Sequence, residues 1–127
     1  MRRAIKRATA SQQSYQDAAR ALGCVICKRM GWSQPNETHI HHRNVGDLHG
    51  QKQLGQDEVV AMCAYHHEGV ILNGSSEEEM RSNWGPSFKL HARDFRVWTQ
   101  DVLPGYPRGT EGWQKVQNEL LGESHAD

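Results

Sequence analysis

The chain has 127 residues, with fifteen Lys and Arg side chains balanced by fifteen Asp and Glu, so its formal net charge is zero. This length predicts one domain with a modest hydrophobic core that a bound metal ion would help to stabilise. No apolar run approaches the roughly 20 residues of a membrane span, and no apolar signal segment follows the basic N-terminus. We therefore expect a cytoplasmic protein that does not associate with a membrane.

The N-terminal part of the chain is strongly basic. Residues 1–29 contain seven Lys and Arg side chains but only one Asp, whereas the rest of the chain is acidic. A basic arm on an acidic protein is typical of an element that contacts the phosphates of a nucleic acid. The residues that we expect to make these contacts are Arg2, Arg3, Lys6 and Arg7. The alternative is an ordinary solvated helix face.

Residues 3–22 are predicted to form one helix. The segment is rich in alanine and ends at Gly23, a residue type that commonly terminates helices. Residues 28–37 contain glycine, proline and asparagine and are predicted to form a loop.

All three cysteines lie between residues 24 and 63, in spacings typical of a zinc site. Cys24 and Cys27 form one C-x2-C pair, and Cys63 and His66 form a second pair of the same spacing. Three thiolates and one imidazole complete the closed tetrahedron that a structural zinc ion prefers. An odd number of cysteines also argues against a disulfide framework and favours a reducing compartment.

Two short strands are predicted between these pairs, at residues 38–43 and 58–62, joined by a polar loop over 44–57. A helix over residues 64–72 follows the second strand. A hairpin packed on a helix and held by zinc at its base is a ββα unit, which is too small to fold without its metal. We thus expect an α+β fold: a small zinc-stabilised ββα-metal domain with an N-terminal helix and C-terminal helices.

The C-terminal part is predicted to contain two short helices at residues 76–84 and 87–100. Phe88, Phe95 and Trp98 recur at helical spacing and are expected in the core, with Arg93 and Arg96 outside as phosphate contacts. Glycines and prolines after Leu103 indicate an extended segment, with a last amphipathic turn or two of helix over residues 113–121. The expected division is a basic N-terminal helix over 1–22, a zinc-bound domain over 23–103 and an extended C-terminal tail over 104–127.

The complete pattern resembles the HNH endonucleases of the ββα-metal, or His-Me finger, superfamily. The resemblance rests on the C-x2-C pair, the His41-His42 pair on the first strand, and Cys63-Ala64-Tyr65-His66-His67 at the end of the second. With Trp84-Gly85-Pro86-Ser87-Phe88 it is similar to phage-encoded proteins related to the recombination-enhancement (Ref) nucleases. It covers about residues 22–98.

This resemblance implies a function and a set of residue roles. The function is hydrolysis of DNA phosphodiester bonds in phage recombination or processing. The implied partners are DNA and a recombination protein or filament, in the host cytoplasm. His42 would be the general base, and His41 and His67 would bind Mg²⁺ or another divalent cation. General-base catalysis by an imidazole beside a divalent ion is suited to phosphodiester hydrolysis.

Two positions depart from the family pattern. The central asparagine has no clear match, and Gln56 or Asp57 holds the nearest place. Ile71 stands where the last metal ligand is expected, so Asn73 is the nearest replacement.

Strict alternation along a strand would also place His41 and His42 on opposite faces and group His39 with His41 as a second choice of metal pair. A bulge or strong twist would be needed to bring His41 and His42 to one phosphate. The alternative function is a non-catalytic zinc module that binds DNA or a protein partner in phage recombination or packaging.

Overall fold

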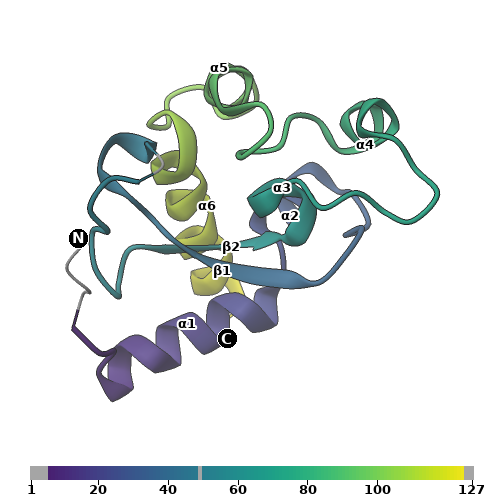
Figure 1. Ribbon diagram of the computed structural model, residues 1–127. Coiled ribbons are helices and arrows are strands. Elements are labelled where there is room, and N and C mark those ends of the chain that lie inside the picture. The colour runs from purple at the N-terminus through teal and green to yellow at the C-terminus, as the bar shows by residue number, and fades with distance from the viewer. Residues whose placement is uncertain (1–5, 49, 125–127) are drawn as a thin grey trace.

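The computed structural model describes residues 6–48 and 50–124. This part of the chain contains six α-helices, one short 3-10 helix and a two-stranded sheet, which confirms the mixed α+β class (Figure 1). The elements are α1 (Ala10–Leu22), α2 (Val25–Met30), β1 (Thr38–His42), η1 (Val45–Asp47), β2 (Val59–Cys63), α3 (Ala64–Glu68), α4 (Glu77–Trp84), α5 (Ala92–Val102) and α6 (Gly109–Ser124).

Strands β1 and β2 form an antiparallel hairpin at the centre of the molecule. The pairing runs without interruption from Thr38 opposite Cys63 to His42 opposite Val59. Every residue of β2 is buried, as its unbroken apolar sequence requires. In Figure 1, α1 lies below the hairpin, α2 and α3 lie above it, and α6 lies behind it. Both strands are confirmed to within one residue of the predicted bounds.

Helix α1 begins later than the sequence suggested. Thr9 forms a capping box with Gln12, in which the Thr9 Oγ1 accepts from the Gln12 backbone N–H at 3.1 Å. In return, the Gln12 side chain accepts from the Thr9 backbone N–H at 2.9 Å. Residues 6–9 are therefore not helical, because this cap fixes the first turn at Ala10. The earlier part of the predicted helix, with Arg2 and Arg3, lies outside the described residues.

Helices α2 and α3 are short, and each is stopped by a glycine. Gly31 and Gly69 both have φ near 76°, in the left-handed region where other residues are strained. The expectation of a helix over 64–72 was thus wrong beyond Glu68. The predicted loop over 28–37 begins only after α2 ends at Met30.

The C-terminal segment is more helical than predicted, since helix α6 spans Gly109–Ser124 and not only a turn or two over 113–121. Its Trp113 and Val116 are buried in the main core. Gly112, which indicated an extended chain, is required for close packing. A Cβ there would lie 2.1 Å from the Pro107 carbonyl oxygen. Glycine in this helix therefore reflects a tight contact instead of an irregular backbone.

A buried glutamine of α6 attaches this helix to the edge of the sheet. The Gln117 side chain accepts from the Ala61 backbone N–H at 2.7 Å and donates to the Val59 carbonyl oxygen at 2.9 Å. These are backbone groups that a third strand would otherwise pair. The side-chain amide of Gln117 thus takes the place of a neighbouring strand along β2.

Helix α4 starts as expected, with Ser76 and Glu79 forming a capping box. Helix α5 begins at Ala92, five residues later than predicted, because residues 85–91 are an irregular segment and a turn that pack against α3. The Phe88 backbone N–H donates to the His66 carbonyl at 2.9 Å within this contact. Phe88 and Phe95 are buried, as predicted, and Trp98 packs against the core.

Candidate metal centres

The two predicted zinc-binding pairs meet in one buried cluster. Cys24 precedes α2, Cys27 lies within it, and Cys63 ends β2 immediately before the helix that carries His66. The His66 Nδ1 atom lies 3.6 Å from the Cys24 Sγ, 3.8 Å from the Cys27 Sγ and 3.3 Å from the Cys63 Sγ. A tetrahedral zinc ion, with bonds of about 2.3 Å to sulfur and 2.0 Å to nitrogen, separates such atoms by about 3.5 Å. The four residues therefore fit a bound metal such as zinc.

The ring of His66 is held with its Nδ1 atom toward the sulfurs. Its Nε2 atom lies 2.7 Å from the carbonyl oxygen of Trp84, which can only accept a hydrogen bond. Nε2 therefore carries the proton, and the Nδ1 lone pair is directed at the cluster. The ring of Trp32 stacks on His66 with a centroid separation of 6.2 Å. The side chain of His66 is fully buried, so this centre is closed to solvent.

Crowding of thiols and imidazole perturbs their acidities. Burial raises the pKa of Cys24, but hydrogen bonds with Cys27, Cys63 and His66 outweigh it and hold this pKa well below its usual value. Burial likewise lowers the pKa of His66, yet the sulfurs of Cys24 and Cys63 raise it overall to about 10. Hydrogen bonding with the other two sulfurs, together with burial, raises the pKa of Cys27. The cluster thus favours a thiolate at Cys24, the form that metals bind.

A second and more open cluster lies on the other side of α3. The Nδ1 atoms of His39 in β1 and His67 in α3 are 3.0 Å apart. The Glu68 Oε1 atom lies 3.7 Å from the first and 3.6 Å from the second. Two nitrogens bound to one divalent ion at about 2.1 Å are about 3.0–3.4 Å apart, so the imidazole pair fits a metal and the carboxylate lies slightly further out.

This second cluster differs in part from the predicted one. The expectation from the family resemblance was His41, His67 and Asn73. The structure brings His67 together with His39, the residue that strand alternation favoured, and with Glu68, which the sequence analysis missed. Glu68 follows His67 directly, and that adjacency was the available signal. Asn73 is exposed in a turn beyond α3 and is not among the residues that line the hollow around His67.

His41 lies beside this cluster. It is 6% exposed, and its ring centroid is 5.0 Å from that of His67 and 5.0 Å from that of Phe88. His41 and His39 share one face of the hairpin because the strand is regular. The bulge that would turn His42 toward the same face does not occur, since the pairing of residues 38–42 is continuous.

His42 is held by Gln56. Its Nε2 atom lies 2.9 Å from the Gln56 Oε1 atom. The Gln56 amide nitrogen already donates to the Lys6 carbonyl at 2.8 Å, so its oxygen must be the acceptor. Nε2 of His42 therefore carries the proton, which leaves Nδ1 as the basic nitrogen. Gln56 is one of the two residues that stood nearest to the missing asparagine in the sequence.

A hollow of about 370 Å³ brings these groups within reach of one ligand. It follows β1 and is bordered by His41, His42, His67, Glu68 and Lys89. Both His41 and His42 border the hollow, although neighbouring residues of a regular strand point to opposite faces. The hollow therefore combines potential metal ligands, one potential base and one lysine.

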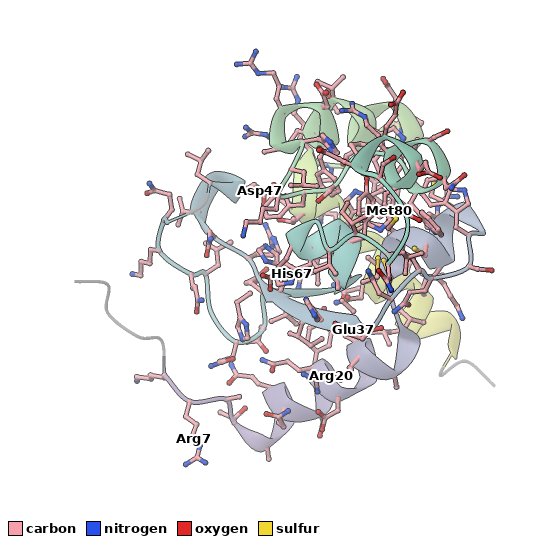
Figure 2. All side chains as sticks on the ribbon, turned by 45° about the vertical axis from the view of Figure 1, so that its right-hand side comes forward. Arg7, Arg20, Glu37, Asp47, His67 and Met80 are labelled. Carbon is pink, nitrogen blue, oxygen red and sulfur yellow. The ribbon has the colours of Figure 1, made fainter. Side chains whose placement is uncertain are left out.

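The predicted phosphate contacts lie in two separate regions. Lys6 and Arg7 are exposed ahead of α1, and Figure 2 shows Arg7 on the α1 side of the molecule with Asp47 on the opposite side. Arg93 and Arg96 lie on α5 and border a different hollow from the histidines.

Comparisons with known proteins supply no relative. No protein-family model matches the chain, and neither the curated proteins nor the solved structures contain a match. Within the described residues, no helix is both long and apolar enough to cross a membrane.

Proposed function

We propose that this protein is a metal-dependent endonuclease that hydrolyses DNA phosphodiester bonds. One observation carries the proposal: His66 and His67, neighbours on α3, face two different ligand clusters, one closed and one open. His67 and Glu68 of the open cluster border the same hollow as His42. A structural metal beside an accessible one is the arrangement expected of a small hydrolytic domain that is stabilised by zinc.

The proposed residue roles are supported by the positions of the side chains. The closed cluster would hold a zinc ion. His67, with His39 and Glu68 and with His41 alongside, would hold Mg²⁺ or another divalent cation in the open cluster. The bound cation would stabilise negative charge on the phosphate and on the departing 3′ oxygen.

His42 is the proposed general base. Its Nε2–H donates to Gln56, so Nδ1 can take a proton from a water molecule. The water oxygen then bonds to phosphorus as the bond from phosphorus to the 3′ oxygen breaks. Lys89, exposed at the border of the same hollow, would hold a non-bridging phosphate oxygen.

A second candidate function is a zinc module that binds DNA or a protein partner without cutting. The regular pairing of β1 favours it, because this pairing directs His42 away from the face that carries His39 and His41. The missing central asparagine favours it as well.

Plasmid nicking by the zinc-loaded protein, with Mg²⁺, Mn²⁺ or added Zn²⁺, separates these functions. We expect His42→Ala to reduce nicking by about 10²–10⁴-fold, the usual contribution of a general base. Gln56→Ala removes the acceptor that orients His42, together with the side-chain hydrogen bonds of Gln56 with Gln16 and Lys6, and should have an intermediate rate. Zinc content and melting temperature should stay close to wild type in both variants. A folded, zinc-loaded wild-type protein that nicks no plasmid with any of the three metals would leave the binding module as the function.

A further inference from the structure

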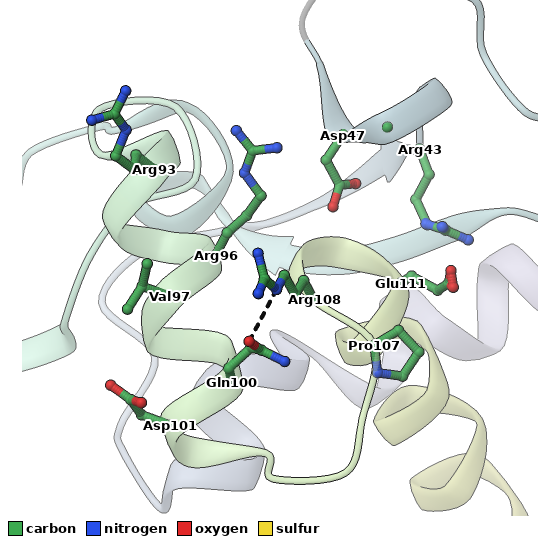
Figure 3. A pocket seen from close by; sticks show the side chains of 11 residues that line it. Arg43, Asp47, Arg93, Arg96, Val97, Gln100, Asp101, Pro107, Arg108 and Glu111 are labelled. Atoms are coloured by element: carbon green, nitrogen blue, oxygen red, sulfur yellow. Dashed lines mark hydrogen bonds between the residues drawn. The ribbon is translucent and has the colours of Figure 1, made fainter.

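A second hollow, of about 680 Å³, lies between α5, the segment after β1 and the start of α6 (Figure 3). Arg93 and Arg96 project from α5, and Arg108 approaches from the segment before α6. We call the part of the hollow that these three residues line the arginine groove. The three arginines come from two separate parts of the chain, so the fold itself brings their positive charges together.

These guanidinium groups are available to a ligand. In the described chain, Arg93 and Arg96 form no ion pair or hydrogen bond through their side chains, and Arg108 donates only through Nε, to the Gln100 side chain at 2.9 Å. Arg43, which also borders the hollow, differs because it is buried and binds Glu58 at 2.7 Å and Gln114 at 2.7 Å. Arg43 therefore stabilises the fold, whereas the guanidinium groups of the other three can contact a ligand.

Among the described residues, none of the acidic residues that border the hollow forms an ion pair with the arginine groove. Asp47 is engaged by Thr110 at the start of α6, where both carboxylate oxygens accept, one of them from the backbone N–H at 2.9 Å. Figure 3 shows Asp101 at the opposite end of the α5 segment from Arg93. Glu111 lies on the far wall, beside Pro107.

The arginine groove adjoins the hollow of the histidines. Asn44 and Gly50 border the histidine hollow, and Gly46 and Asp47, in the same loop, border the groove. Lys89 on the histidine side is followed four residues later by Arg93. Cationic side chains thus border both hollows.

We propose that the phosphate backbone of the DNA strand cut at the histidines continues into the arginine groove and is anchored there. Guanidinium groups bind phosphate through paired N–H donors. The hollow contains no aromatic residue on which a base could stack, and its apolar lining is limited to Val97 and Pro107. The groove therefore contacts phosphates and does not read bases. This inference rests on the proposed function for its choice of DNA.

The test measures DNA binding separately from cleavage. Zinc-loaded protein is titrated, without added Mg²⁺ or Mn²⁺, onto two fluorescent duplexes of unrelated sequence over a series of NaCl concentrations. Each phosphate contact contributes about 0.9 to the slope of log K against log salt. We expect the triple variant Arg93→Ala, Arg96→Ala, Arg108→Ala to lower that slope by about 2–3 on both duplexes.

Two variants provide controls. Arg20→Ala removes an exposed arginine of α1, whose position in Figure 2 is far from Asp47, and should leave the slope unchanged. Arg96→Lys keeps the charge but not the paired donors, and should weaken binding less than Arg96→Ala. The substituted side chains are exposed or half-buried, so the melting temperature should stay within a few degrees of wild type.

The outcomes separate the groove from the nuclease. An unchanged slope in the triple variant overturns the arginine groove even if the wild type nicks plasmid. A reduced slope in the triple variant, with no nicking by the wild type, supports the phosphate contacts of the groove and excludes the nuclease function. Equal affinity of the wild type for polyglutamate, lost in the triple variant, would show a general polyanion surface and overturn the assignment to DNA.

Discussion

The two clusters that meet at α3 differ both in their ligands and in their burial. The closed cluster of Cys24, Cys27, Cys63 and His66 is fully enclosed by the core. The open cluster has two half-buried histidines and the exposed Glu68. Four buried ligands satisfy a metal completely, whereas three partly exposed ligands leave coordination positions for water or substrate. The difference teaches that burial, ligand number and ligand type change together between a centre that would stabilise the fold and one that would be available for chemistry.

Their supporting contacts differ in the same way. His66 is oriented by a backbone carbonyl and covered by Trp32. The Nε2 atom of His39 has an exposed carboxylate, that of Glu37, at 3.5 Å. The closed centre is therefore held by rigid groups, and the open one includes side chains that can adjust to a ligand.

Removal of a ligand from the closed cluster should have the largest effect. Cys24→Ser should abolish cooperative folding, because binding of a structural zinc ion contributes about 10–16 kcal/mol to small zinc domains. Bound zinc by mass spectrometry and thermal melting by circular dichroism should be lost together. A variant that melts cooperatively without zinc would show that the core alone supports the fold.

Removal of a ligand from the open cluster should leave the fold intact. His67→Ala should bind the activating divalent metal more than ~100-fold more weakly, since even the outer partners of metal ligands contribute about 10–100-fold. Zinc content and melting temperature should match the wild type, and excess Mn²⁺ should partly restore nicking. His42→Ala is the matched control and should keep its metal affinity. Loss of the structural zinc in His67→Ala would contradict the separation of the two clusters.

A backbone substitution beside the closed cluster should have a smaller effect. Gly85 has φ 72° and ψ −168°, a conformation restricted to glycine, and it follows the Trp84 carbonyl that orients His66. Gly85→Ala should destabilise the protein by about 1–3 kcal/mol and weaken zinc binding by about 10–100-fold. Chelator competition measures the zinc affinity.

Gly74→Ala provides the matched control for this substitution. Gly74 has φ 86°, and a Cβ there would contact nothing within 4 Å. It should cost comparable stability and leave zinc affinity unchanged. Equal zinc affinities in the two variants would mean that the carbonyl of Trp84 does not hold His66.

The smallest effect concerns the third ligand of the open cluster. Glu68→Gln keeps the shape of the side chain but removes its charge, and should weaken divalent-metal binding by about tenfold, or roughly 1.4 kcal/mol. Asn73→Ala should have no effect, because Asn73 lies outside the hollow. Isothermal titration with Mn²⁺ distinguishes the two. The opposite result would restore Asn73 as the ligand.

Sequence patterns predicted the closed cluster completely because its ligands lie in two pairs of the same short spacing, one at the start of α2 and one where β2 meets α3. The open cluster was predicted only in part. The position of His39 depends on whether β1 is regular or bulged, and strand alternation and the family resemblance gave different answers there. The extent of helix α6 was underestimated because Gly109 and Gly112 indicate irregular backbone when considered alone. Only its close contact with Pro107 explains why residue 112 of α6 is a glycine.

The attachment of Gln117 to β2 also has a consequence for solubility and assembly. A two-stranded sheet has two exposed edges, and each can pair with a strand from another molecule. Gln117 occupies the backbone groups of Val59 and Ala61 along one of them. Strand-to-strand association between copies, and growth toward fibrils, is thereby blocked on the β2 side, where the sequence is most apolar.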